Sequence, residues 1–307
     1  FPSQLSPEPS LRYLEVILTY RCNLRCRHCY IGEPENVEVP LEKLLQALQE
    51  FYEMQGLRVL FSGGEPLIYR HFDELNEFLK DYPLRKVLLT NGTLLTEKRL
   101  KGLNFHEIQF SIDGLEVSHD LIRGKGSFKK TIEALKRAKD MGFDVSVATM
   151  VHRANLQDFG ELEDLLRALG VKEWTVDVPV PEGRLRDNED LSLPPEVAGP
   201  YLRYGFGGGM HGADGPYGCG AHLMAILPEG TAAKCSFYAK MPLGRIEEGL
   251  RVCWKRLRPV ILDELNCKGC PELYTCRGGC RYRAEVCLIE NGPDPYRCYA
   301  FGVGRRG

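Results

Sequence analysis

The sequence predicts an α/β protein in which a partial, TIM-like (β/α)6 barrel is followed by a small, irregular, cysteine-rich region. Two observations support this prediction. Between residues 14 and 178, strand patterns alternate six times with helical patterns, and such an alternation implies a parallel sheet. After residue 178 prolines and glycines interrupt the pattern, and most of the twelve cysteines lie beyond that interruption.

The alternation begins with residues 14–19, which alternate in polarity and carry β-branched side chains as strands do. Residues 40–52 follow with apolar side chains at helical spacing, and the apolar run 58–61 then indicates a short buried strand. The remaining predicted strands are 86–90, 106–112, 143–150 and 173–178, and the remaining predicted helices are 71–81, 95–102, 127–141 and 156–169. This length of chain favours an open six-unit barrel over a closed eight-unit one.

Three cysteines form a tight loop after the first predicted strand. Cys22, Cys26 and Cys29 are separated by three and then by two residues, and the next cysteine is distant in sequence. This spacing can hold three corners of a 4Fe–4S cluster, which leaves one iron open to the amino and carboxylate groups of S-adenosylmethionine. The alternatives are three structural thiols or a zinc site, although zinc usually takes paired C-x2-C ligands.

This loop, with the aromatic His28 directly before its last cysteine, resembles the loop of the radical SAM superfamily. The resemblance implies reductive cleavage of S-adenosylmethionine to a 5'-deoxyadenosyl radical and a contact between His28 and the cofactor. Residues 62–66, after the second predicted strand, resemble the family's Gly-Gly-Glu-Pro motif. By that resemblance Gly63, Gly64 and Glu65 hold the methionine amino group of the cofactor, whereas taken alone they indicate a tight turn.

Polar residues also end the third and fourth predicted strands. Thr90 and Asn91 end the third strand and Asp113 follows the fourth, where each can contact the cofactor or the substrate; turn formation and helix capping are the alternatives. In related enzymes the serine after the fourth strand contacts the cofactor's ribose and a later arginine pairs with its carboxylate. These roles are implied for Ser111 and Arg123, because an arginine fork can bind both carboxylate oxygens. A solvated surface arginine is the alternative.

Composition divides the chain into a barrel domain, residues 1–204, and a second domain, residues 205–307. Residues 205–220 contain eight glycines, which is typical of a flexible connection. The order of cysteines beyond it resembles the SPASM extension of radical SAM enzymes. That resemblance implies three 4Fe–4S clusters in all, with one auxiliary cluster on Cys267, Cys270, Cys276 and Cys298 and the other on Cys219, Cys235 and Cys280.

The second auxiliary cluster lacks a fourth thiol, because residues 210–214, where several relatives carry one, contain no cysteine. The open alternatives are Cys253, Cys287, an oxygen or nitrogen ligand such as Asp214 or His211, solvent, or the substrate. Cys253 lies in a predicted amphipathic helix, and both spare thiols have ordinary structural explanations. We therefore favour an open or non-cysteine fourth site.

The resemblance to SPASM proteins favours a ribosomally made peptide as substrate, because most SPASM-bearing enzymes modify peptides. Residues 278–284 and Asp294 with Pro295 also resemble enzymes that modify tetrapyrrole side chains in haem d1 and alternative haem synthesis, which is the second interpretation. Sulfatase-maturing relatives carry an aspartate base where this chain has Ser236, which argues against that activity. A non-catalytic iron–sulfur electron carrier is the third interpretation, but electron transfer alone needs none of the predicted cofactor contacts.

The expected partners are a separate leader-recognition protein, since no recognition domain is evident, and an electron donor of the ferredoxin or flavodoxin type. A net charge of −2 gives no reason to expect nucleic acid or a membrane surface. There is no signal peptide and no apolar run near 18 residues, so a cytoplasmic protein is expected. Clumped cysteines favour metal ligation in a reducing compartment over secreted disulfides.

Overall fold

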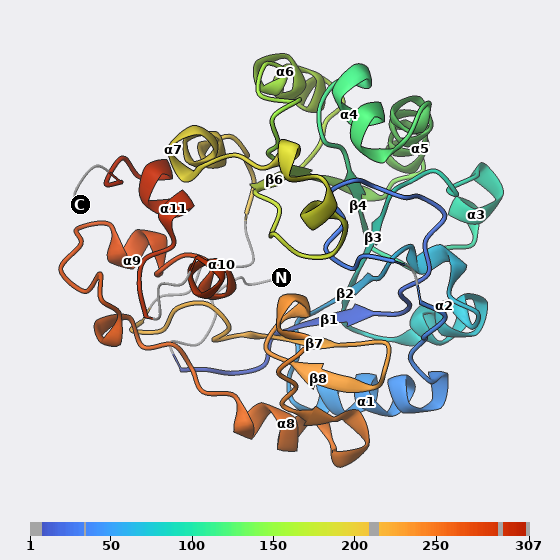
Figure 1. The fold of residues 1–307 in the computed structure, drawn as a ribbon. Helices are drawn as coiled ribbons and strands as arrows, with labels where there is room; N and C mark the ends of the chain where they lie inside the picture. Colours follow the sequence, from blue (N-terminus) through green and yellow to red (C-terminus); the bar gives the residue numbers. More distant parts are fainter. Residues whose placement is uncertain (1–7, 34, 209–214, 288–290, 305–307) are drawn as a thin grey trace.

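A computed structural model of the chain describes residues 8–33, 35–208, 215–287 and 291–304. Its centre is a nine-stranded sheet in the order β6-β5-β4-β3-β2-β1-β7-β8-β9. Strands β1 to β6 all pair in parallel. They are Tyr13–Ile17, Arg58–Ser62, Arg85–Thr90, Glu107–Ser111, Asp144–Met150 and Glu173–Asp177. The predicted α/β fold with a partial barrel is therefore confirmed (Figure 1).

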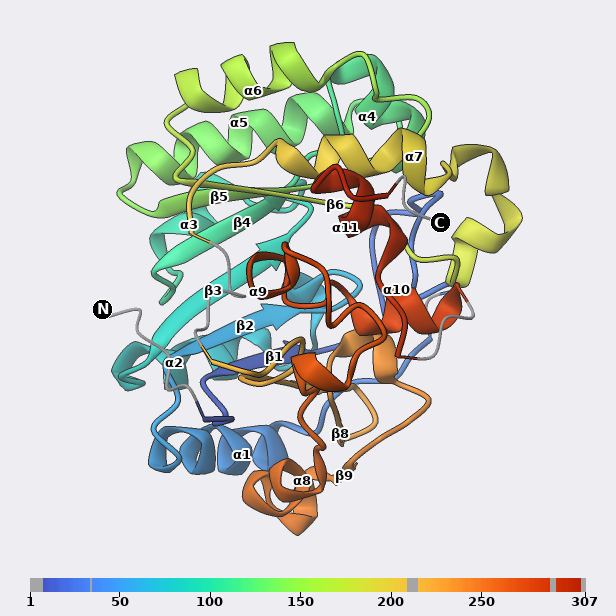
Figure 2. The same ribbon diagram turned by 90° about the vertical axis from the view of Figure 1, so that its left-hand side faces the viewer.

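Six helices cover the outer face of the curved sheet (Figures 1 and 2). Helices α1 to α6 are Leu41–Glu53, Phe72–Asp81, Glu97–Lys101, Glu116–Arg123, Ser127–Asp140 and Phe159–Ala168. The main core lies between these helices and the sheet, where Leu14 and Val16 of β1 belong to one cluster with Leu44 and Leu48 of α1. Burying one apolar stripe of each helix against the sheet is the usual way to stabilise such layers.

Helix α4 is the one element of the barrel that the sequence pattern does not predict. Val117 is 84% exposed and Leu121 is 51% exposed, while Ile122 is buried. The apolar side chains that stand at helical spacing, Val117 and Leu121, thus face solvent, and the helix has only eight residues in which a period could be recognised. The omission matters because α4 ends at Arg123.

Three short strands extend the sheet beyond β1: β7 is Leu223–Ile226, β8 is Thr231–Ala233 and β9 is Gly244–Arg245. Strand β7 pairs in parallel with β1, and β8 and β9 follow as antiparallel strands. Strands this short give almost no periodic signal in a sequence. The sheet continues across the predicted boundary between residues 204 and 205, and the division into two domains stays a prediction.

The cysteine-rich end of the chain contains only short helices in irregular backbone. Helices α7 to α11 are Pro195–Ala198, Leu250–Arg256, Leu273–Cys276, Arg281–Val286 and Pro295–Ala300. Helices α9, α10 and α11 lie at the open side of the barrel, between β6 and β7 (Figure 1). Arg283 of α10 fixes this placement by pairing with Asp177 at the end of β6 and with the buried Asp294, at 2.5 and 2.6 Å. In the described part of the chain, no helix is long and apolar enough to cross a membrane.

Candidate active site

The loops that follow β1, β2, β3 and β4 meet at one edge of the sheet, because parallel strands share the same carboxyl edge. The loop after β2 is bonded directly to the cysteine loop after β1. The Gly64 N–H donates to the Thr19 carbonyl at 2.7 Å, and the Glu65 N–H donates to the Arg21 carbonyl at 2.8 Å. A Cβ atom on Gly64 would lie 2.2 Å from the Arg21 oxygen, and one on Gly63 would lie 2.7 Å from the Thr19 oxygen. These glycines thus allow two protein loops to touch.

Gly64→Ala is expected to destabilise the protein by about 1–3 kcal/mol, because the new methyl group overpacks against backbone that cannot rotate away. Thermal unfolding of the purified protein measures the loss. The matched control is Gly160→Ala in α6, where a Cβ atom meets nothing within 4 Å and a gain of a few tenths of a kcal/mol is expected. Equal unfolding temperatures for the two variants would contradict the role of Gly64.

The thiols of Cys22, Cys26 and Cys29 are free and lie close enough together that the charge on one raises the pKa of another. Burial raises the pKa of Cys22 to about 11 and also raises the pKa of Cys26. A nucleophilic cysteine needs a lowered pKa, so these thiols are unsuited to nucleophilic catalysis. Burial and grouping fit metal ligation, in which the metal displaces the thiol proton.

Gly183 and Arg184, which lie beyond β6, hold the cysteine loop from the far side of the barrel. The Arg184 Nε donates to the Cys26 carbonyl and its backbone N–H donates to the Cys29 carbonyl, both at 2.9 Å. A Cβ atom on Gly183 would lie 2.4 Å from the Cys29 oxygen. The sequence analysis missed both residues, because a Gly-Arg pair in a proline-rich stretch carries no recognisable signal.

Glu65 is fully buried and accepts three hydrogen bonds. Its Oε1 accepts from the Leu67 N–H at 3.2 Å and from the Thr90 hydroxyl at 2.8 Å, and its Oε2 accepts from the Asn91 N–H at 3.0 Å. Burial nevertheless raises the pKa of Glu65 to about 7. Thr90 and Asn91 therefore orient Glu65, and Oε2 keeps one lone pair for a further donor. The Asn91 amide also donates to Asn23 in the cysteine loop at 2.9 Å.

Asp113, just after β4, is fully buried and binds Arg123. The Arg123 Nε lies 2.6 Å from the Asp113 Oδ2, and the Arg123 Nη1 lies 3.9 Å from the Cys26 sulfur. Burial alone would raise the pKa of Asp113, but Arg123 and His28 outweigh it and hold the pKa below its ordinary value. The Nη side of Arg123 is thus directed toward the cysteine loop. Ser111, the last residue of β4, lies two residues before Asp113 and is partly exposed.

His28 is buried beside this ion pair, with its Nε2 3.4 Å from the Asp113 Oδ2. Burial lowers the pKa of His28 to about 4, so the ring is neutral at pH 7. Among the described residues nothing bonds to its buried Nδ1. A buried polar atom without a partner is costly unless a ligand bonds to it, so this atom fits contact with a bound cofactor.

Two further residues that the sequence analysis missed hold Asp113 in place. The Asp113 carbonyl accepts from the Asn155 amide at 2.9 Å and lies 3.2 Å from the His152 Nε2. The Met150 N–H donates to the Asp113 Oδ1 at 2.8 Å. Met150 is the last residue of β5, and His152 and Asn155 lie in the turn after it. Only the tertiary structure brings these three residues to the end of β4.

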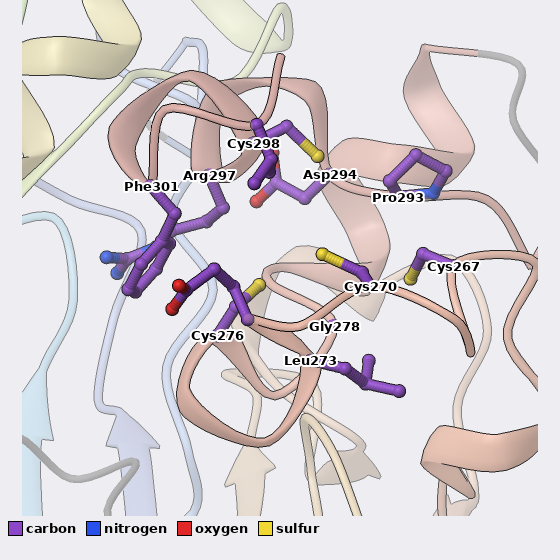
Figure 3. Close-up of a pocket in the computed structure, with 12 residues that line it drawn as sticks. Cys267, Cys270, Leu273, Cys276, Gly278, Pro293, Asp294, Arg297, Cys298 and Phe301 are labelled. Carbon is purple, nitrogen blue, oxygen red and sulfur yellow. The ribbon is translucent and has the colours of Figure 1, made fainter. Parts of the chain in front are cut away.

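Four cysteines near the C-terminus line a single pocket. Cys267 and Cys270 come from the turns before α9, Cys276 is the last residue of α9, and Cys298 comes from α11 (Figure 3). Gly278, Asp294 and other neighbours complete the lining. Four thiols around one space are a ligand set of the kind that holds a 4Fe–4S cluster.

A second group contains Cys219, Cys235 and Cys280. Burial raises the pKa of Cys235, and the nearby Cys219 and Cys280 raise it further. Cys253 is fully buried in the main core and donates to the Arg245 carbonyl at 3.4 Å.

The other spare thiol lies at the opposite end of α10 from this second group. Cys280 precedes the helix and Cys287 follows it, and seven residues of helix rise about 10 Å. Cys287 lines a different pocket, with Val286 and Tyr296. The alternative ligands His211 and Asp214 lie outside the described residues.

Comparison with known proteins agrees with this geometry. A family model for the radical SAM superfamily matches residues 16–166. The AdoMet-dependent heme synthase of Nitratidesulfovibrio vulgaris is 30% identical over 184 residues, covering 57% of this chain and 50% of the synthase. The chain thus spans about half the length of that relative. The mycofactocin maturase MftC of Mycolicibacterium smegmatis is 28% identical over 317 residues, covering 91% of this chain and 80% of the maturase.

Among solved structures, native anSMEcpe with bound AdoMet and Cp18Cys peptide superimposes with a TM-score of 0.73 at 20% identity. The superposition covers 96% of each chain. At this identity the likeness establishes a shared fold. The residues matched by the family model contain the cysteine loop and the strand ends around it, so residues 16–166 form a radical SAM domain.

Proposed function

We propose that the protein is a radical SAM enzyme that cleaves S-adenosylmethionine reductively and abstracts a hydrogen atom from a ribosomally made peptide. The choice of a peptide as substrate rests on how much of this chain each relative matches. The match to the mycofactocin maturase covers 91% of this chain, whereas the match to the heme synthase covers 57%. The anSMEcpe structure with a similar fold also contains a bound peptide.

In this proposal Cys22, Cys26 and Cys29 hold the cluster that reduces the cofactor, which supplies the radical when bound. The protein's own groups bind and orient the cofactor. The Nη side of Arg123, held by Asp113, binds the cofactor's carboxylate, and Glu65 binds its ammonium group. Residues proposed to contact the remaining parts of the cofactor are Gly63, Gly64, His28 and Ser111.

The proposal includes two auxiliary 4Fe–4S clusters. Cys267, Cys270, Cys276 and Cys298 hold one of them, and the pocket that these residues line supports this assignment. Cys219, Cys235 and Cys280 hold the other. The burial of Cys253 in the main core and the position of Cys287 beyond α10 support a fourth ligand that is not a cysteine. A ferredoxin- or flavodoxin-type electron donor and a separate leader-recognition protein complete the proposed system.

Glu65→Gln and Arg123→Ala are each expected to weaken binding of S-adenosylmethionine by about tenfold to a hundredfold. The reason is that a hydrogen bond to a charged group is worth about 1.5–3 kcal/mol. Equilibrium dialysis of the reconstituted protein against labelled cofactor measures the affinity. Lys129→Ala is the control, because this side chain is exposed on α5. Wild-type affinity in both test variants would rule out these roles.

Co-expression with each short open reading frame that lies beside this gene, followed by mass spectrometry of the encoded peptides, tests the choice of substrate. A mass change that requires Cys22, Cys26 and Cys29 is the expected result. The second candidate, modification of a tetrapyrrole side chain, is favoured by the 30% identity to the heme synthase. A product from iron coproporphyrin and an unchanged peptide would establish that candidate. Failure to form 5'-deoxyadenosine after full reconstitution would instead favour an electron carrier.

A further inference from the structure

The inner face of β1 carries a carboxylate that no part of the proposed cofactor site uses. Side chains alternate along a strand, and Leu14 and Val16 belong to the main core beneath α1. Glu15 and Ile17 therefore face the inside of the barrel. Ile17 packs there in a separate cluster with Leu227, Ala233 and Tyr238, against which Cys235 also packs. Glu15 thus lies on the face that carries one of the C-terminal cysteines.

The inner face of the sheet is covered unevenly. Val87 of β3 and Glu107 of β4 are buried, whereas Leu89 and Gln109 farther along the same strands are only partly buried. In a closed barrel the inner residues pack in layers and fill the interior. The open, partial barrel therefore leaves part of its inner face accessible, and ligands commonly bind to concave surfaces of this kind.

Glu15 lies on this inner face beside the Cys235 loop. Its register neighbours on the two flanking strands are Leu60 and Ala225, and Ala225 in turn pairs with Ala233. All three neighbours are buried, whereas Glu15 is partly exposed. The Ser236 hydroxyl and backbone N–H lie close enough to the Glu15 carboxyl group to oppose the rise in its pKa that burial causes.

Tyr30 lies near the same point. It directly follows Cys29 of the cysteine loop, and its ring packs against that of Phe237, the neighbour of Ser236, at a centroid distance of 5.2 Å. Its hydroxyl lies close enough to Ser236 and Glu15 for both to affect its pKa. Glu15, Tyr30 and Ser236 are each partly exposed despite their depth in the fold. Their polar atoms are therefore available to a molecule that lies between the N-terminal cysteine loop and the Cys235 loop.

We propose that Glu15, with Ser236 and Tyr30 beside it, forms the site that binds a hydrogen-bond donor of the peptide substrate: a backbone N–H, a hydroxyl or an ammonium group. This inference rests on the proposed peptide-modifying function and names the residue that positions the peptide. Glu15 lies between the two cysteine-bearing loops, because Tyr30, next to Cys29, and Ser236, next to Cys235, are both near it. A carboxyl group at this point favours a hydrogen-bond donor over an apolar side chain, because an apolar side chain would leave the carboxyl group without a partner.

The test compares Glu15→Gln with the wild type on a peptide that the wild type modifies in the co-expression experiment above, using the protein with all its clusters. The variant is expected to raise KM or lower the rate of peptide modification by about tenfold to a hundredfold. It should form 5'-deoxyadenosine without peptide at the wild-type rate and contain the same amount of iron. Glu173→Gln is the control, because Glu173 lies on the inner face of β6 at the other end of the barrel, and wild-type modification is expected.

A second variant separates binding from a structural role. Because Ser236 lies beside Glu15, combining Glu15→Gln with Ser236→Asp moves the carboxylate to the neighbouring side chain. The double variant is expected to modify the peptide at least tenfold faster than Glu15→Gln alone. Peptide modification by Glu15→Gln at the wild-type rate would overturn the proposal. So would a loss that Ser236→Asp does not repair. If the wild type modifies no peptide in the co-expression experiment, the proposed function has failed and this inference fails with it.

Discussion

Replacing Cys22, Cys26 and Cys29 together by alanine is expected to abolish formation of 5'-deoxyadenosine from S-adenosylmethionine. The three thiols lie in one loop, which Arg184 holds from one side and the loop with Gly64 and Glu65 holds from the other. The next cysteine in the chain is Cys219. The triple variant should lose about four iron atoms per chain, one 4Fe–4S cluster. Chromatography of the cofactor products and an iron assay on the same reconstituted sample measure both quantities.

The C-terminal cysteines provide the matched control for this experiment. Cys267→Ala combined with Cys270→Ala changes the pocket that four thiols line near the C-terminus. That variant is expected to lose a similar amount of iron while its N-terminal loop still supports cofactor cleavage in the absence of substrate. Cofactor cleavage that persists in the N-terminal triple variant would refute the assignment of the reducing cluster to this loop.

Asp113→Asn is expected to lower the free energy of unfolding by about 3–5 kcal/mol, the usual cost of leaving one partner of a buried ion pair uncompensated. Asp113 is fully buried and the Arg123 side chain is only 12% exposed. The variant should also bind S-adenosylmethionine more weakly, because Arg123 loses the contact that directs its Nη side toward Cys26. Denaturant unfolding measures the first effect, and equilibrium dialysis against labelled cofactor measures the second.

Two comparisons identify the ion pair as the cause. Glu163→Gln breaks a more exposed pair with Arg167 on α6, and a change below about 1 kcal/mol is expected there. Adding Arg123→Gln to Asp113→Asn removes the second charge, so the double variant should lose less stability than the sum of the two single variants. Strictly additive losses would show that Asp113 and Arg123 do not stabilise each other.

The strand and helix positions of the barrel follow from the sequence because each element has a strong local signal. The apolar spacing in residues 40–52 and the short run 58–61 correspond to α1 and β2 within one or two residues. The cysteine loop is equally local, since its three cysteines lie within eight residues. Helix α4 spans only eight residues, which is too short for a helical period to stand out in the sequence.

The sequence by itself determined the fold class and the radical SAM motif, because each depends on the spacing of residues that are close together in the chain. The metal-binding role of the grouped thiols stays a prediction from that spacing. The tertiary structure decided what the charged residues do. It showed that Arg123 is held by Asp113 and that Glu65 is held by the loop after β3. It also brought Glu15 to Ser236, which is 221 residues away in the chain. Contacts of this kind depend on which strands are neighbours in the sheet, and local patterns carry no information about that order.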